Sequence, residues 1–153
     1  MPSFFFDTSG LVKKYIRELG TNWVMQTLNP SRNHRIYVAP TTCVELHATL
    51  KRRELDVTMM KSADVREELQ YDLLKRFYAV PVTDTLLSMG CDIAWKYALR
   101  GYDAIQLASA LSIAAGYTRP ARKTPVTFVS ADPELLGAAH SEGFAVEDPN
   151  DYE

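Results

Sequence analysis

Four acidic residues stand where predicted helices begin, and their side chains are the best suited to chemistry: Asp7, Glu45, Asp103 and Asp132. Carboxylate oxygens in this number suit Mg²⁺ or Mn²⁺, whereas zinc prefers His or Cys ligands. Clustered carboxylates repel one another, so a bound cation would stabilise them. The sequence therefore predicts one divalent-metal site, provided that the fold brings the four side chains together.

Each acid also has a structural explanation, because an acidic side chain at a helix start can cap backbone N–H groups. Asp132 precedes a proline, which is a favourable arrangement for an N-cap. Thr42 and Glu45 have the spacing of a capping box, in which Glu45 would bond back to Thr42. Asp7 and Asp103 are possible caps too. Such caps contribute only about 1 kcal/mol, and uncharged Ser or Asn would serve equally well.

Two patterns of apolar residues predict the elements that must position these acids. Short β-branched or aromatic runs predict strands over residues 3–6, 35–39, 78–82, 125–129 and 143–146. Helical spacing predicts helices over residues 8–19, 22–28, 43–53, 62–77, 84–99, 103–115 and 133–142, with a turn at 100–102. This alternation is typical of an α/β fold, here a three-layer α/β/α sandwich around a mainly parallel sheet.

The four acids fall at one edge of the predicted sheet. Asp7 directly follows the first strand, and Asp132 lies three residues after the fourth. Glu45 begins the helix after the second strand, and Asp103 begins a helix that returns to the same edge. Since sites in parallel sheets form at the carboxyl ends of strands, these positions favour one shared site over four separate caps.

Length and composition are those of a single globular domain: 153 residues, 46% hydrophobic and 24% charged. No apolar run approaches the roughly 20 residues that span a bilayer, and no signal peptide is evident, so we expect a cytoplasmic protein without a membrane partner. Cys43 and Cys91 lie in apolar helical patterns and are predicted to be buried, reduced thiols. The net charge of −2 argues only weakly against a nucleic-acid partner, because bound cations would neutralise several acids.

Four sequence blocks carry a resemblance to a known family. In chain order they are MPSFFFDTSGLVKKY, VELHATLKRR, LRGYDAIQLASAL and VTFVSADPELLGAA, and they resemble the PIN domain. More narrowly, they are similar to the VapC toxins of type II toxin–antitoxin pairs. The resemblance implies a five-stranded parallel sheet and a Mg²⁺- or Mn²⁺-dependent endoribonuclease that hydrolyses RNA phosphodiester bonds with metal-activated water.

The resemblance also assigns roles to residues and partners. It implies that Asp7, Glu45, Asp103 and Asp132 form the acidic metal site, with the Ser130 hydroxyl beside it. Thr8 and Ser9 belong to the first block, and they either assist the site or simply begin the helix. A homodimer and a small cognate antitoxin protein are implied as partners, and helix 62–77 has enough apolar residues to serve one of these contacts or only the core.

An RNA substrate needs cations around so acidic a site. The candidate phosphate contacts follow Asp7 or Glu45 on their helices or occupy the segment 116–124: Lys13, Lys14, Arg17, Lys51, Arg52, Arg53, Arg119, Arg122 and Lys123. Any one of these could equally be a solvated surface charge.

Two other functions stay open, a different metal-dependent phosphohydrolase and a non-catalytic binding module, whereas a metal-free ribonuclease is disfavoured. A haloacid-dehalogenase-like phosphatase would need an aspartate two residues after Asp7, where this chain has Ser9, and no glycine-rich nucleotide-binding motif is present. The scattered His34, His47 and His140 are predicted to be surface or packing residues, which disfavours a metal-free ribonuclease. A non-catalytic PIN-like module that binds RNA or protein would be distinguished by a failure to bind Mn²⁺.

Overall fold

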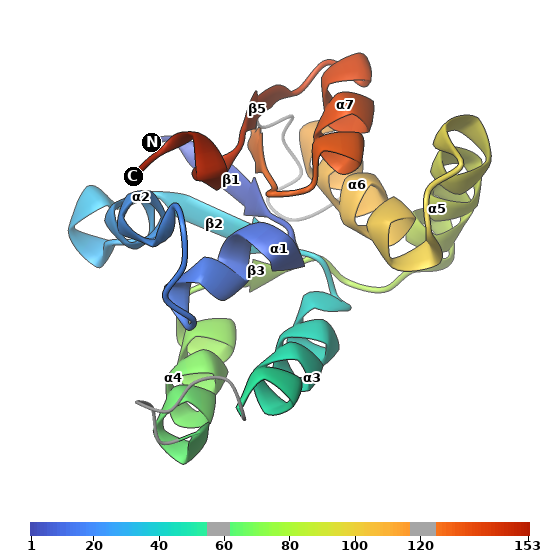
Figure 1. Ribbon diagram of the computed structural model, residues 1–153. Helices are drawn as coiled ribbons and strands as arrows, with labels where there is room; N and C mark the ends of the chain where they lie inside the picture. Colours follow the sequence, from blue (N-terminus) through green and yellow to red (C-terminus); the bar gives the residue numbers. More distant parts are fainter. Residues whose placement is uncertain (55–61, 117–124) are drawn as a thin grey trace.

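The centre of the structure is a sheet of five parallel strands in the order β3-β2-β1-β4-β5 (Figure 1). Short aromatic and β-branched runs form β1 (Ser3–Phe6), β2 (Arg35–Val38), β3 (Tyr78–Ala79), β4 (Thr127–Val129) and β5 (Ala145–Glu147). The first strand of the chain is the central one, and it pairs with β2 on one side and β4 on the other. The carboxyl ends of all five strands therefore point to one edge of the sheet.

The computed structural model describes residues 1–54, 62–116 and 125–153. Its helices are α1 (Thr8–Leu11), α2 (Thr21–Thr27), α3 (Thr42–Arg53), α4 (Ser62–Lys75), α5 (Asp84–Tyr97), α6 (Gly101–Ala114) and α7 (Pro133–Ser141), with 3-10 turns η1 (Val12–Lys14), η2 (Pro30–Arg32) and η3 (Pro149–Asp151). Within this part of the chain, no helix is both long and apolar enough to cross a membrane.

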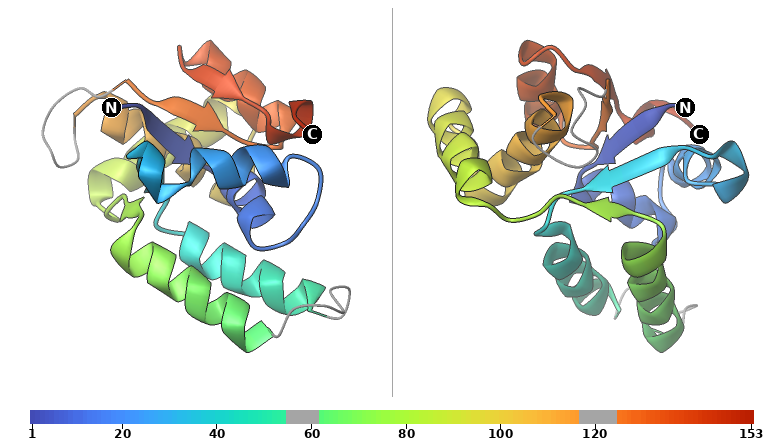
Figure 2. Two further views of the ribbon diagram at one scale, coloured as in Figure 1. Left: turned by 90° about the vertical axis from the view of Figure 1, so that its left-hand side faces the viewer. Right: turned by 180° about the vertical axis from the view of Figure 1, so that it is seen from behind.

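Two hydrophobic cores lie on opposite faces of the sheet. Consecutive strand residues point to opposite faces, so Phe5 joins the core beneath α5, α6 and α7, while Phe6 joins the core beneath α1, α2, α3 and α4. Figure 2 shows these two groups of helices on either side of the strands. The predicted three-layer α/β/α fold with a five-stranded parallel sheet is confirmed.

The prediction of one helix over residues 8–19 is wrong. The chain leaves the α-helix after Leu11, forms the short turn η1 and then curls back. The curl is held by Lys13, whose Nζ donates to the Leu19 carbonyl at 2.9 Å and to Glu18 Oε1 at 3.0 Å. These interactions within the loop compete with continued helix.

Gly20, the residue directly after the predicted helix 8–19, begins the next helix. It is the N-cap of α2 with a φ of 85°, a conformation that side chains disfavour. A Cβ at this position would lie 2.2 Å from the Pro149 carbonyl oxygen, so only glycine fits against the C-terminal segment.

Two further predictions need correction. The expected turn at 100–102 is not formed, because α6 already begins at Gly101 and places Asp103 in its first turn. Cys43 and Cys91 are both exposed instead of buried, since they lie on the solvent-facing sides of α3 and α5. His34 does pack as expected, with its ring 5.0 Å from that of Phe4.

A buried ionic network ties α4 to η1. Asp72 is only 1% exposed and accepts hydrogen bonds from Tyr15 Oη at 2.7 Å and Arg76 at 2.8 Å, and it also pairs with Lys14. A second ion pair joins Glu18, from the loop after η1, to Arg53 at the end of α3 at 3.1 Å. Both helices of the α3–α4 pair are thus fastened to the segment that follows Asp7.

Candidate functional site

The four predicted acids lie at the carboxyl edge of the sheet. Asp7 follows β1, and Asp132 follows β4 as the N-cap of α7. Glu45 and Asp103 lie in the first turns of α3 and α6. Within the three described ranges, no three His, Cys, Asp or Glu side chains already stand in an arrangement that could hold a metal ion. Two of the acids, Asp7 and Asp103, nevertheless interact electrostatically with neighbouring carboxylates, as their raised pKa values show.

Asp7 is the buried member of the group. It is 4% exposed, and its carboxylate accepts hydrogen bonds from Gly10 N at 2.8 Å, Ser9 Oγ at 2.8 Å and Ser130 Oγ at 3.0 Å. Burial raises the pKa of Asp7 to about 7, the three donors oppose that rise, and the negative charge of Asp103 adds to it. Near neutral pH this carboxyl exchanges a proton readily, and a cation could take the proton's place.

Asp103 interacts electrostatically with the other two acids, Glu45 and Asp132. It is half-buried, and burial raises its pKa first, followed by the negative charges of Asp132 and Glu45. Two residues that the sequence reasoning missed also act on it: Glu134 raises its pKa further, and Arg100 lowers it. Arg100 lies three residues before Asp103, and Glu134 lies two residues after Asp132. This nearness to predicted acids is the one feature of the sequence that pointed to them.

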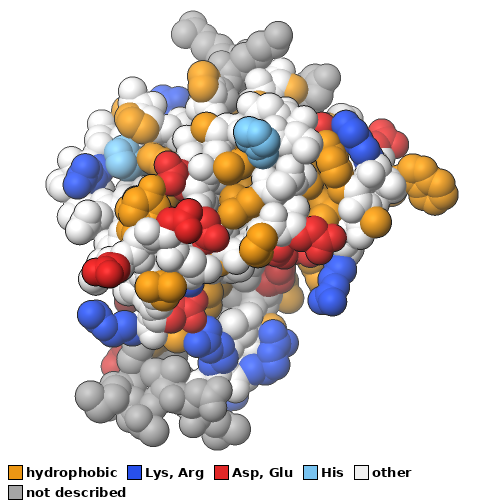
Figure 3. All heavy atoms as spheres, turned by 45° about the horizontal axis from the view of Figure 1, so that its top comes forward, with side chains coloured by type: hydrophobic (Ala, Val, Ile, Leu, Met, Phe, Trp, Pro, Cys, Tyr) orange, Lys and Arg blue, Asp and Glu red, His pale blue; other side chains and the backbone are white. Residues whose placement is uncertain are grey.

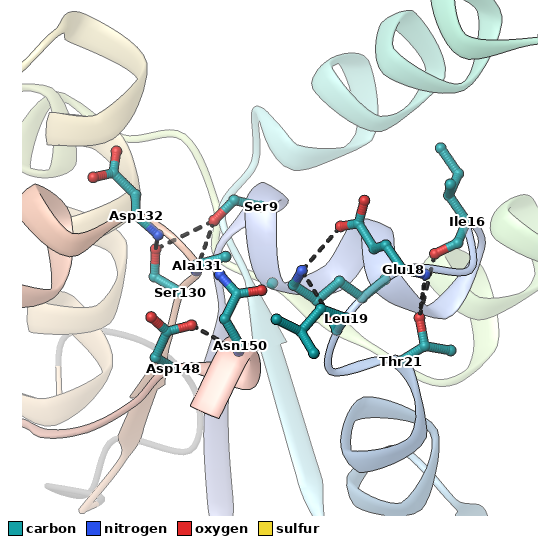
Figure 4. A network of polar contacts seen from close by, with 12 residues as sticks. Ser9, Ile16, Glu18, Leu19, Thr21, Ser130, Ala131, Asp132, Asp148 and Asn150 are labelled. Carbon is teal, nitrogen blue, oxygen red and sulfur yellow. Dashed lines mark hydrogen bonds and ion pairs between the residues drawn. The ribbon is translucent and has the colours of Figure 1, made fainter. Parts of the chain in front are cut away.

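Two serines connect Asp7 to the α7 helix start. Ser130 is fully buried; its hydroxyl donates to Asp7 Oδ2 and accepts from Asp132 N at 3.0 Å. Ser9 bonds both carboxylate oxygens of Asp7 and accepts from Ala131 N at 2.9 Å. Figure 4 shows Ser9, Ser130 and Ala131 side by side, with the Asp132 carboxylate turned away from them. Ser130 therefore lies beside the first acid, and Ser9 holds an equivalent position.

The capping predictions for the acids have mixed outcomes. Asp132 caps α7 as expected, accepting from Glu134 N at 2.9 Å, and Asp7 caps α1 through Gly10. Asp103 is not a cap, because Arg100 holds that position in α6.

The predicted capping box at Glu45 is wrong. The N-cap of α3 is Thr41, whose side chain makes no capping hydrogen bond, so Thr42 lies inside the helix. Glu45 Oε1 instead accepts a hydrogen bond from Gln106 Nε2 at 3.0 Å, across to α6. Gln106 was not predicted as a site residue, and its one sequence signal is a polar side chain within an Ala/Leu-rich helix, three residues after Asp103.

The predicted phosphate contacts divide into four groups. Lys13 and Lys14 have side chains only 5% exposed and are held in ion pairs, so contact with RNA would require those pairs to break. Arg17 and Arg52 are exposed. Lys51 and Arg53 pair with Glu54 and Glu18.

The fourth group, Arg119, Arg122 and Lys123, lies outside the described residues. Figure 3 shows Lys and Arg side chains mainly around the outline of one face, with several acidic side chains nearer its middle.

The donor set fits a hard divalent cation. It consists of oxygen atoms from carboxylates and hydroxyls, which suit Mg²⁺ or Mn²⁺. Burial and mutual repulsion disfavour several negative charges here, as the raised pKa values of Asp7 and Asp103 indicate. A cation would offset that repulsion.

Comparisons with known proteins agree with this architecture. The model of the family described as PIN domain matches residues 4–133. Among solved structures, PAE2754 from Pyrobaculum aerophilum is 17% identical with a TM-score of 0.61, covering 98% of this chain and 85% of that one.

Two more solved structures are similar. FitAB bound to an IR36 DNA fragment is 14% identical with a TM-score of 0.63, covering 98% of both chains. VapBC-5 from Mycobacterium tuberculosis, a member of the VapBC family of toxin–antitoxin systems, is 20% identical with a TM-score of 0.50, covering 97% of this chain and 98% of that one. These identities are low enough that the likeness shows the fold alone. No curated protein sequence matches the chain.

Proposed function

Since the chain belongs to the PIN domain family, whose members are generally nucleases, we propose that it is a metal-dependent endoribonuclease and the toxin of a VapBC-type pair. The observation that carries the proposal is the buried Asp7, whose pKa is raised to about 7. The neighbouring Asp103 contributes to that rise, and its own pKa is raised by the negative charges of Asp132 and Glu45. A purely structural cap would not need this accumulation of charge.

Four carboxylates would hold the metal, Mg²⁺ or Mn²⁺: Asp7, Glu45, Asp103 and Asp132. No three of them already stand in an arrangement that could hold an ion, so the four side chains would have to rearrange as a cation binds. When bound, such a cation lowers the pKa of a coordinated water and balances the negative charge that develops during phosphodiester hydrolysis.

The chain's own residues prepare this site. Ser9 and Ser130 fix the orientation of the Asp7 carboxylate through their hydroxyls. Asp7 would release its proton as a cation arrives, so metal binding should become weaker below neutral pH. Arg100 is an exposed cation close enough to act on Asp103, and it is our first candidate for contact with an RNA phosphate, followed by Arg17 and Arg52.

We further propose a cytoplasmic homodimer that binds a small antitoxin. The support is that similar structures carry the names FitAB and VapBC, the latter a toxin–antitoxin system. Tyr71 and Leu74 on α4 add support, since they are 60% and 77% exposed and leave an apolar surface uncovered.

The decisive experiment compares RNA cleavage by the wild-type chain with and without Mg²⁺. Asp7→Asn and Asp103→Asn should each abolish metal-dependent cleavage, because each removes a ligand charge, and sequencing of cleaved total RNA would map the target. Asp64→Asn is the matched control, since Asp64 is exposed on α4. Undiminished cleavage by either site variant would refute the metal site, whereas a wild-type chain that binds no Mn²⁺ would favour a non-catalytic binding module.

A further inference from the structure

The Gln106 side chain lies buried among three of the elements that carry the acids. It is 2% exposed, and its Nε2 lies within hydrogen-bonding distance of three acceptors. These are Glu45 Oε1 at 3.0 Å, Thr42 Oγ1 at 3.1 Å and Thr8 Oγ1 at 3.1 Å. One amide group therefore contacts both α1 and α3 from its place on α6.

The chemistry of the three acceptors fixes the orientation of this amide. An amide nitrogen has two hydrogens, and the charged Glu45 oxygen is the strongest acceptor of the three. The opposite orientation would bring the Gln106 oxygen against the carboxylate, where both atoms carry only lone pairs. The nitrogen consequently faces Glu45.

This orientation leaves an unsatisfied atom. Gln106 Oε1 is buried and has no hydrogen-bond partner among the described residues. An unsatisfied buried carbonyl is unfavourable, and such groups are rare enough to need an explanation. A residue kept for packing alone would be an apolar one in this Ala/Leu-rich helix.

The position of Gln106 connects it with the other acids. It follows Asp103 by three residues, so the two side chains lie on the same side of α6. Thr8, one of its contacts, directly follows Asp7. Gln106 thus joins Glu45, which is only half-buried, to the segments that carry the first and third acids.

We infer that Gln106 is a positioning residue whose amide holds the Glu45 carboxylate toward Asp103. The inference rests on the proposed metal site and deepens it. Without the amide, the Glu45 side chain is free to turn into solvent from the first turn of α3. The Glu45 carboxylate is then still present, but its side chain loses conformational freedom when a cation binds. That entropic cost weakens the affinity for metal.

The test is a Mn²⁺ titration of the RNA-free protein, followed by the electron paramagnetic resonance signal of free Mn²⁺. Gln106→Met keeps the length of the side chain and removes its hydrogen bonds. We expect about tenfold weaker Mn²⁺ binding, the lower end of the usual effect of losing a residue that orients a ligand. Gln70→Met, at an exposed position on α4, should bind as the wild type does.

A double-variant comparison separates positioning from general damage. In a Glu45→Ala background, Gln106→Met should cause no further loss, because the side chain it orients is gone. If thermal melting shows that Gln106→Met does not fold, Gln106→Asn, which keeps the amide but is one methylene too short, is expected to show the same tenfold loss and the same dependence on Glu45.

Three results would overturn the inference. Wild-type affinity in a folded Gln106 variant is the first, and an equal loss in the presence and absence of Glu45 is the second. The third is a wild-type chain that binds no Mn²⁺, which refutes the proposed metal site as well. Failure confined to the Gln106 variants refutes the positioning role alone.

Discussion

Replacing Asp7 by Asn should make the metal-free protein more stable at pH 8, although it should abolish activity. Asp7 has an ordinary pKa of 3.8, which applies to the unfolded chain, and burial raises it to about 7 in the folded protein. Well below pH 4 the carboxyl is neutral in both states and has no effect. Between about pH 4 and pH 7 the unfolded chain ionises while the folded protein keeps its proton, so stability is lost progressively across this window and stays at its lower value above it.

The size of the effect follows from the same values. Each pKa unit corresponds to about 1.4 kcal/mol, so a rise from 3.8 to about 7 destabilises the ionised folded state by about 4 kcal/mol. The amide of Asn keeps an acceptor for Gly10 N but must turn its NH₂ group toward Ser9 and Ser130, which offsets about 1 kcal/mol. The remaining ~3 kcal/mol corresponds to a rise in melting temperature of roughly 6–12 °C for a chain of this size.

Thermal unfolding in EDTA at pH 8 and pH 4 measures this directly. The advantage of Asp7→Asn at pH 8 should almost disappear at pH 4, and added Mn²⁺ should raise the melting temperature of the wild type but not that of Asp7→Asn. The exposed Asp64→Asn variant should follow the wild type under all conditions. A lower stability of Asp7→Asn at pH 8, or a difference that is the same at both pH values, would show that burial does not penalise this charge.

Other perturbations test the support around the site. Asp72→Asn should lower the free energy of unfolding, measured by urea denaturation, by about 3–5 kcal/mol, because it leaves Lys14 and Arg76 without their buried partner. An effect below about 1 kcal/mol would contradict a structural role for the ionic network. Gly20→Ala should lower that free energy by at least about 2 kcal/mol, since the residue has a positive φ and its Cβ would meet the Pro149 carbonyl; near-wild-type stability would mean that the C-terminal segment packs elsewhere.

The sequence predicted the sheet and the location of the acids because both depend on local pattern. The run of three phenylalanines before Asp7 predicts a buried strand, and an acid directly after a strand of a parallel sheet lies at its carboxyl edge. The same reasoning placed Asp132 correctly, including its role as a cap.

The predictions that failed depend on contacts between distant parts of the chain. Leu11, Tyr15 and Ile16 are buried, as their spacing predicts, yet the chain there is not one helix. The spacing of apolar residues predicts which side chains are buried. The backbone conformation of this segment depends partly on the ion pair between Lys14 and Asp72, which are 58 residues apart, and the spacing does not predict that ion pair.

The partner of Glu45 was missed for a similar reason. The capping-box spacing offered a partner three residues away, but the donor that the fold supplies is Gln106, 61 residues away. The exposure of Cys91 could not be read from its helix either, since the pattern shows that a helix exists more reliably than which way each side chain faces.

The central position of β1 has a consequence for the order in which the proposed site is assembled. The strand that leads to Asp7 is made first, but its neighbour β4 is made more than 120 residues later. Ser130 and Asp132 follow β4, so neither the second hydroxyl bond to Asp7 nor the fourth acid exists until β4 and the residues after it have been synthesised. A nascent chain on the ribosome, which is itself surrounded by RNA, therefore carries an incomplete centre, and the proposed ribonuclease cannot assemble before Asp132 has been added.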